Sequence, residues 1–140
     1  MPTVIFLLSL ITFSFAHADL KKVTDFYKES ETSYQKALKE KTSSKKAVYL
    51  KDLKKSFENT LNEYEKKNPK KGNDQENEVS LLYYTLEPVF ELAELPKISE
   101  KDCDKKEMTV RSHASLGKPE GTKLSLRALE ALRWIEVLCK

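Results

Sequence analysis

In two consecutive stretches after residue 18, apolar side chains recur mostly every three or four positions. The positions between them are mainly Lys, Glu, Asp, Asn and Thr. This spacing places the apolar residues on one face of an α-helix, and it predicts two helices that each lie on a core with one side in water. The two stripes are formed by Leu20, Val23, Tyr27, Tyr34 and Leu38, and by Ala47, Leu50, Leu53, Phe57, Leu61 and Tyr64.

The hydroxyl residues Thr42, Ser43 and Ser44 interrupt the apolar pattern between the two stripes. Serine and threonine hydroxyls are favoured at the N-cap of a helix, so we expect the second helix to begin here. Asp19 can cap the first helix in the same way. We expect the two helices to pair as an antiparallel hairpin, and one continuous helix over residues 20–67 is the alternative.

Prolines and polar residues divide the rest of the chain. The residue before a proline is pushed out of the helical region, so the second helix should end at Asn68 and the polar stretch Pro69–Asn77 should form a loop. A third helix is predicted after it, with a kink or break at Pro88, because proline lacks an amide hydrogen and clashes with the preceding turn. The apolar positions of this third helix are Val79, Leu82, Tyr83, Leu86, Val89, Phe90 and Ala93.

The stretch Ile98–Thr122 has no strong helical period and is predicted to be a short irregular segment. Within it the residues Ser99, Glu100, Lys101 and Asp102 could open a short helix, and Gly117 is placed as the C-cap of a weakly helical run over Thr109–Leu116. From Leu124 onward, apolar residues cover most of the surface of a last helix. A helix that is apolar on most sides is usually the buried centre of a bundle, and Cys139 is expected to point at that core. The predicted fold is all-α: one domain over residues 19–140, a small bundle of about four main helices with a kinked third helix and a short irregular segment before a buried C-terminal helix.

The first eighteen residues carry no Lys, Arg, Asp or Glu. Their apolar core, Val4–Phe15, leads into Ala16, His17 and Ala18, which is the layout of a secretory signal peptide with a small-x-small cleavage site. The apolar stretch is shorter than the ~20 residues that a spanning helix needs. We therefore expect residues 1–18 to be cleaved, and the protein to be exported to the periplasm or the extracellular space without stable membrane insertion. An uncleaved anchor is the alternative, because no basic residue precedes the apolar core.

The charge of the chain is high in total but balanced in sign. There are 25 Lys and Arg residues against 22 Asp and Glu, and the net charge is +3. The lysine pairs of the first half alternate with acidic residues, whereas a nucleic-acid-binding face normally has clustered basic charge. A solvated surface is the better interpretation, and we expect no nucleic-acid partner.

Candidate catalytic chemistry is sparse. After residue 18 the chain has a single histidine, His113, and a nucleophile needs a base close by. The metal-ligand types Asp102, Cys103, Asp104, Glu107 and His113 gather in one segment, but without a zinc or calcium spacing. The chain's three glycines cannot build a phosphate-binding loop. We expect no catalytic site, no metal and no cofactor.

Three aromatic residues, Tyr49, Tyr84 and Trp134, fall off the apolar stripes of their helices. Because aromatic residues are enriched at binding surfaces, these three are the candidate contact surface. Together with the export signal they favour a non-enzymatic interaction protein of the cell envelope or secreted fraction, with a protein partner. A carrier of an apolar small molecule or lipid held between helices is the alternative, because the last helix has more apolar surface than a four-helix core requires.

Cys103 and Cys139 are predicted to form a disulfide, since an even number of cysteines in an exported protein suggests a bond. Two free thiols are the alternative. Closing a loop of this size contributes ~3–4 kcal/mol in the chain-entropy model. Thiol titration of the denatured, unreduced protein should find no free thiol, and two should appear after reduction. Two free thiols before reduction would contradict the bond.

Overall fold

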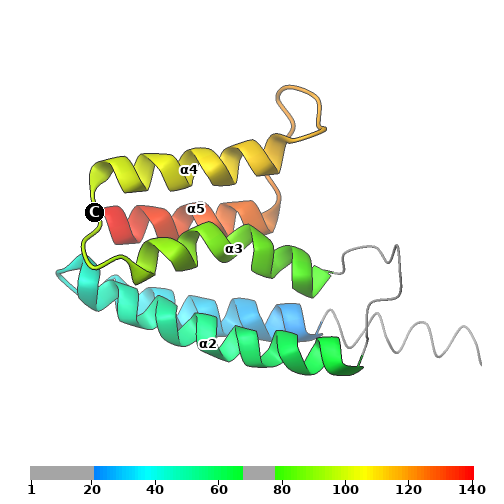
Figure 1. The fold of residues 1–140 in the computed structure, drawn as a ribbon, viewed down its shortest axis with the longest axis horizontal. Helices are drawn as coiled ribbons and strands as arrows, with labels where there is room; N and C mark the ends of the chain where they lie inside the picture. The colour runs from blue at the N-terminus through cyan, green and yellow to red at the C-terminus, as the bar shows by residue number, and fades with distance from the viewer. Residues whose placement is uncertain (1–20, 68–77) are drawn as a thin grey trace, which may run out of the picture.

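Helices account for all the regular secondary structure in the residues described by this computed structural model, which are 21–67 and 78–140 (Figure 1). The predicted signal peptide over residues 1–18, its neighbour Asp19 and the predicted loop Pro69–Asn77 lie outside these residues. The described part contains five helices, so the predicted all-α bundle is confirmed and the count exceeds the expected four by one. None of these helices is long and apolar enough to cross a membrane.

The first two helices are separate and antiparallel, as the hydroxyl residues between them indicated. The first helix is described over residues 21–37, and α2 spans Ser43–Lys67. Thr42 begins α2: its carbonyl accepts from the amide of Lys46 at 3.1 Å. The ring of Phe26 near the start of the first helix packs on that of Phe57 in the later part of α2, with centroids 4.5 Å apart. The hairpin is therefore closed by the predicted stripe of α2 and by Phe26, which lies beside the predicted stripe of the first helix.

The third predicted helix is α3, Glu78–Glu94, and it runs through Pro88 without a break. Proline cannot donate to the carbonyl of Tyr84 one turn earlier, and the ribbon of α3 bows along its length (Figure 1). The helix packs on α2, where the hydroxyl of Tyr83 donates to Glu58 Oε1 at 2.8 Å. Of the kink or break predicted at Pro88, the break does not occur, because buried residues on both sides of the proline hold the helix together.

The segment predicted to be irregular contains a full helix, α4, Glu100–Ser115. A capping box starts it: Ser99 Oγ accepts from the amide of Asp102 at 3.2 Å, and Asp102 Oδ2 accepts from the amide of Ser99 at 3.1 Å. Only Cys103 and Val110 are buried in α4. The pattern of apolar positions therefore missed this helix, because a helix so thinly anchored carries almost no apolar stripe.

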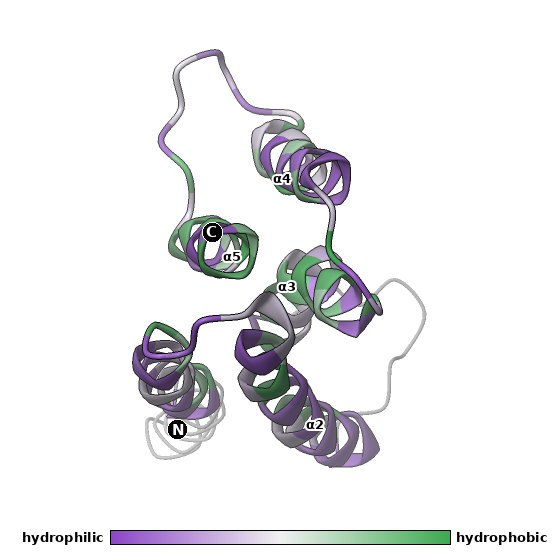
Figure 2. Cartoon of the chain, turned by 90° about the vertical axis from the view of Figure 1, so that its left-hand side faces the viewer, coloured by the Kyte–Doolittle hydropathy of each residue, from purple (hydrophilic) through white to green (hydrophobic). Residues whose placement is uncertain are grey.

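The last helix, α5, spans Leu126–Cys139 and is central, as predicted. It packs against α2, α3 and α4, and Figure 2 shows it between α4 and the first helix, beside α3. Its buried residues come from several faces of the helix, and they are Ala128, Glu130, Ala131, Trp134, Ile135, Val137 and Leu138.

The disulfide joins the first turn of α4 to the end of α5. The sulfur atoms of Cys103 and Cys139 are at bonding distance, 2.01 Å, in the predicted pairing. Cys139 is exposed, however, and does not point at the core. It is the last residue of α5, where the helix leaves the packed part of the bundle, so the bond ties α4 to the bundle at its edge.

Replacing Cys103 with Ser should release α4 while the other helices stay packed. Val110, the other buried side chain of α4, and the ion pair to α3 between Lys106 and Glu91 would then be left to hold α4. Loss of a native disulfide from a small exported domain costs ~2–5 kcal/mol, so the melting temperature followed by circular dichroism should fall clearly. Among the helices, limited trypsin digestion should then cut first in α4, at Lys105, Lys106 or Arg111.

The double variant Cys103→Ser/Cys139→Ser is the control for the thiol that the single variant leaves. It should match the single variant in melting temperature and in the first site of cleavage. First cleavage within α2 or α5 would contradict this account of α4.

Candidate functional site: the groove between α4 and α5

A surface groove of about 780 Å³ runs between α4 and α5. Its α4 wall is formed by Glu100, Asp104, Glu107 and Arg111, which follow one another at helical spacing and so share one face. The disulfide lies at one end, where Cys103 and Cys139 both line the groove. One wall of the groove is thus formed by α4, the helix that the pattern of apolar residues did not predict.

The α5 wall of the groove is mainly apolar. Leu129 and Leu132 of α5 line it, with Leu124 just before the helix, and Leu129 is 50% exposed. Leu126, one turn before Leu129, is also exposed but does not line the groove. These leucines are the surplus apolar surface noted in the last helix, and they are the signal by which the sequence could have indicated the groove.

Charges rim the groove, and most are paired along their own helix. Arg111 Nε lies 2.9 Å from Glu107 Oε1, and Lys140 pairs with Glu136. Glu100 and Asp104 form no ion pair within residues 21–67 and 78–140. The α4 wall near the disulfide is therefore acidic.

A chain of hydrogen bonds, buried at Trp134, Ser30 and Glu130 and exposed at Glu31, joins α5 to the first helix. Trp134 Nε1 donates to Ser30 Oγ at 2.9 Å, and Ser30 Oγ donates to Glu130 Oε1 at 2.5 Å. Arg133 Nη2 donates to the same Glu130 oxygen at 2.8 Å, and Arg133 Nη1 donates to Glu31 Oε2 at 2.6 Å. A buried carboxylate needs such partners, and here both helices supply them.

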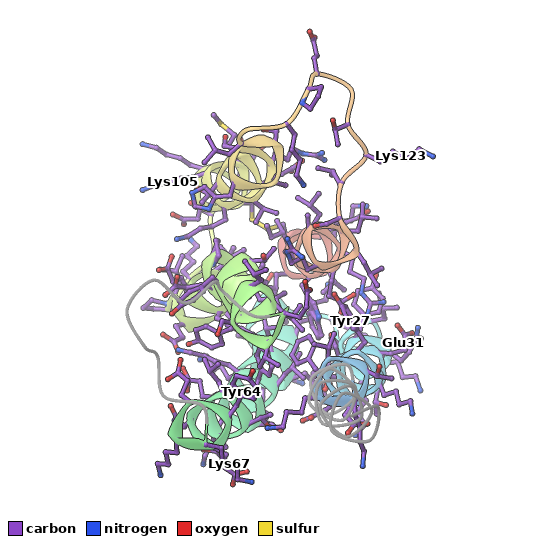
Figure 3. All side chains as sticks on the ribbon, turned by 90° about the vertical axis from the view of Figure 1, so that its right-hand side faces the viewer. Tyr27, Glu31, Tyr64, Lys67, Lys105 and Lys123 are labelled. Carbon is purple, nitrogen blue, oxygen red and sulfur yellow. A yellow bond between two sulfur atoms is a disulfide. The ribbon has the colours of Figure 1, made fainter. Side chains whose placement is uncertain are left out.

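The ionisable groups around this chain are shifted in the directions that their partners require. Hydrogen bonds from Arg133 lower the pKa of Glu31. Burial alone would lower the pKa of Arg133, but its hydrogen bonds to the two glutamates outweigh burial and raise it. Burial, and then the negative charge of Glu130, raise the pKa of Tyr27 to about 12. In Figure 3, Tyr27 and Glu31 lie on the side of the first helix nearest α5.

Trp134 is not part of a contact surface, contrary to the prediction. It is 0% exposed, and its ring meets that of Tyr34 edge to face with centroids 5.5 Å apart. Because α5 is surrounded on several sides, a residue off its main stripe is still covered. Ser30 supplies the partner that the indole N–H needs when it is buried.

The other two predicted contact residues lie apart from each other. Tyr49 is half-buried near the start of α2, and its hydroxyl donates to Glu40 Oε1 at 3.0 Å. That end of α2 meets the end of α5, where Ser43 Oγ donates to the carbonyl of Leu138 at 2.7 Å. Tyr84 is 42% exposed and borders a hollow at the start of α5. The two tyrosines therefore do not form one patch, and neither lines the groove.

Comparison with known proteins assigns no function to this chain. No family model, curated protein or solved structure matches the chain. Within residues 21–67 and 78–140, no three His, Cys, Asp or Glu side chains are placed to hold a metal ion together. The groove has more than twice the volume of the hollow beside Tyr84, about 780 Å³ against about 350 Å³, and it is the candidate functional site.

Replacing Ser30 with Ala should destabilise the protein by about 1–3 kcal/mol, because the indole N–H of Trp134 would lose its partner and Glu130 one of its donors. Urea unfolding followed by the fluorescence of Trp134, the chain's single tryptophan, measures the change. Ser33→Ala, the same substitution at a half-exposed position of the same helix, is the control and should change the free energy of unfolding by less than about 0.5 kcal/mol. Equal losses in the two variants would contradict a special role for Ser30.

Proposed function

We propose that this chain is an exported, non-enzymatic binding protein that holds a helical segment of a partner protein in the groove between α4 and α5. The observation that carries the proposal is the apolar wall of that groove, centred on the half-exposed Leu129. A single exposed leucine is ordinary on a protein surface. Leu129 lies in a groove beside other leucines, and hollowed apolar surface of this kind is typical of binding sites.

The dimensions of the groove suit an amphipathic helix. The 14 residues of α5 extend over roughly 20 Å at ~1.5 Å per residue, which is the length of about four helical turns. An amphipathic helix binds such a groove through apolar residues at positions i, i+3, i+4 and i+7. A partner segment of about 12 residues would cover Leu129 and Leu132 together.

Charge favours a partner segment with basic flanks. Glu100 and Asp104 have no cation paired with them in the described part of the chain, and both stand on the α4 wall. Charges of opposite sign across an interface fix orientation and speed up association. Lysine or arginine beside the apolar face of the partner helix would meet these two carboxylates.

Export is supported by two independent features. The first eighteen residues have the layout of a signal peptide, and the two cysteines after them are joined in a disulfide. Disulfides persist in the periplasm and outside the cell, whereas cytosolic thiols are kept reduced. We therefore expect the partner in the cell envelope or the secreted fraction.

A carrier of an apolar small molecule or lipid is the second candidate, favoured by the volume of the groove. About 780 Å³ falls within the range of ~300–1,000 Å³ common for ligand pockets. Native mass spectrometry of the purified protein separates the two functions. A retained lipid would favour the carrier, and an unliganded mass the interaction protein.

Affinity capture with a groove variant tests the proposed interaction. Wild type, Leu129→Lys and Val48→Lys would be immobilised and exposed to envelope and culture-fluid extracts. Val48 is the matched control, because it is 51% exposed on α2 and does not line the groove. The partner should be retained by wild type and Val48→Lys and lost with Leu129→Lys, while all three proteins keep the same helical spectrum.

The bound segment is then identified by cross-linking from the groove. We expect it to be an amphipathic helix with basic flanks, and a synthetic copy should bind Leu129→Lys at least tenfold more weakly than wild type. Asp104→Lys should also weaken it. Undiminished binding to Leu129→Lys, or a cross-linked segment without an apolar helical face, would contradict the proposal.

A further inference from the structure

A second hollow, of about 350 Å³, lies where α3, the end of α4 and the start of α5 meet. Tyr84 of α3, His113 of α4 and Arg127 of α5 all line it, together with Lys118 from the loop between α4 and α5. It shares no lining residue with the groove. This hollow is therefore a separate candidate site.

The hollow is lined by basic side chains and by no acidic one. His113, Lys118 and Arg127 line it, and no aspartate or glutamate does, although the chain has 22 acidic residues against 25 basic ones. Lys118 forms no ion pair within residues 21–67 and 78–140 and is available to an anion that enters the hollow. Arg127 Nη1 pairs with Glu78 Oε2 at 3.7 Å, outside the lining, so an anion in the hollow would share Arg127 with Glu78.

The rest of the lining is largely apolar. Leu81, Ala114 and Ala128 line the hollow, and the ring of Tyr84 and the side chain of Leu116 are both exposed there. The hydroxyl of Thr85 is already used, because it donates to the carbonyl of Leu81 at 2.7 Å. A ligand that fits this lining has one anionic group and an apolar body.

We infer that this hollow binds a small organic carboxylate with an aromatic or short aliphatic body. The carboxylate accepts charge-assisted hydrogen bonds from Lys118 and Arg127, which are stronger than hydrogen bonds between neutral groups. The body of the ligand covers Tyr84 and Leu116 and removes their apolar surface from water. The volume is at the small end of the range for ligand pockets, so the ligand is smaller than a long-chain lipid.

Titration of the purified protein with three probes tests this inference. Benzoate has both features of the proposed ligand, benzamide keeps the ring without the charge, and inorganic phosphate has the charge without the ring. NMR follows the ring protons of Tyr84 and of His113, which is the one histidine after residue 17. Benzoate should shift both sets of signals to saturation, and the other two probes should bind at least tenfold more weakly.

Charge-neutralising variants locate the site. Lys118→Gln/Arg127→Gln should weaken benzoate binding at least tenfold. Lys118→Gln alone should weaken it at least threefold, and this variant leaves the pair between Arg127 and Glu78 intact. Lys101→Gln/Lys105→Gln removes the same charge from exposed positions of α4, and Lys105 projects away from the bundle in Figure 3. This control should bind benzoate within twofold of wild type.

Three results would overturn the inference: benzamide or phosphate binding as tightly as benzoate, equal losses in the control and hollow variants, or saturating shifts away from Tyr84 and His113. Leu129→Lys should leave benzoate binding unchanged, since Leu129 lines the groove and not the hollow. The outcome is therefore independent of the proposed partner of the groove.

Discussion

The indole N–H of Trp134 and the carboxylate of Glu130 both face the first helix, and each needs a partner there. Ser30 serves both, because its hydroxyl accepts from the indole and donates to the carboxylate. Two polar groups one turn apart on α5 are thereby tied to a single residue, which fixes the rotation of α5 about its own axis. That rotation also decides which residues of α5 face outward, and so it places Leu129 in the groove.

The remaining helices are attached to the bundle by different kinds of interaction. The first helix, α2 and α3 are joined by buried apolar and aromatic contacts such as Phe26 on Phe57. By contrast, α4 buries little and is attached by its disulfide to α5 and by the ion pair of Lys106 with Glu91 to α3. A helix attached in this way can keep a polar outer face and leave hollows between itself and its neighbours. Both candidate sites described above border α4 for this reason.

The amphipathic helices could be predicted from the sequence because their apolar residues repeat with the period of the helix. Ala47, Leu50 and Phe57 are buried as their spacing predicted. Leu38 and Leu129 share that spacing but are about half exposed, since periodicity tells which residues share a face and not whether another element covers it. For the same reason Trp134 was misplaced: its burial depends on helices that are distant in the sequence.

The sites were harder to predict than the fold. The groove and the hollow are both formed with α4, whose start depends on a local hydrogen-bonded cap between Ser99 and Asp102. The leucines of α5 gave a sign of surplus apolar surface, but their location needed the position of α4. The grouping of His113, Lys118 and Arg127 had no signal in the sequence, because three separate elements bring these residues together.

The central position of α5 also has a consequence for the order of folding. It is the last of the five helices in residues 21–67 and 78–140, yet it packs on α2, α3 and α4 and bonds to the first helix through Ser30. Contacts between residues so distant in sequence form late, after the loops between them have closed. A chain that emerges from its N-terminal end therefore cannot complete its core until α5 has emerged. Until then α2 and α3 lack the helix against which both of them pack.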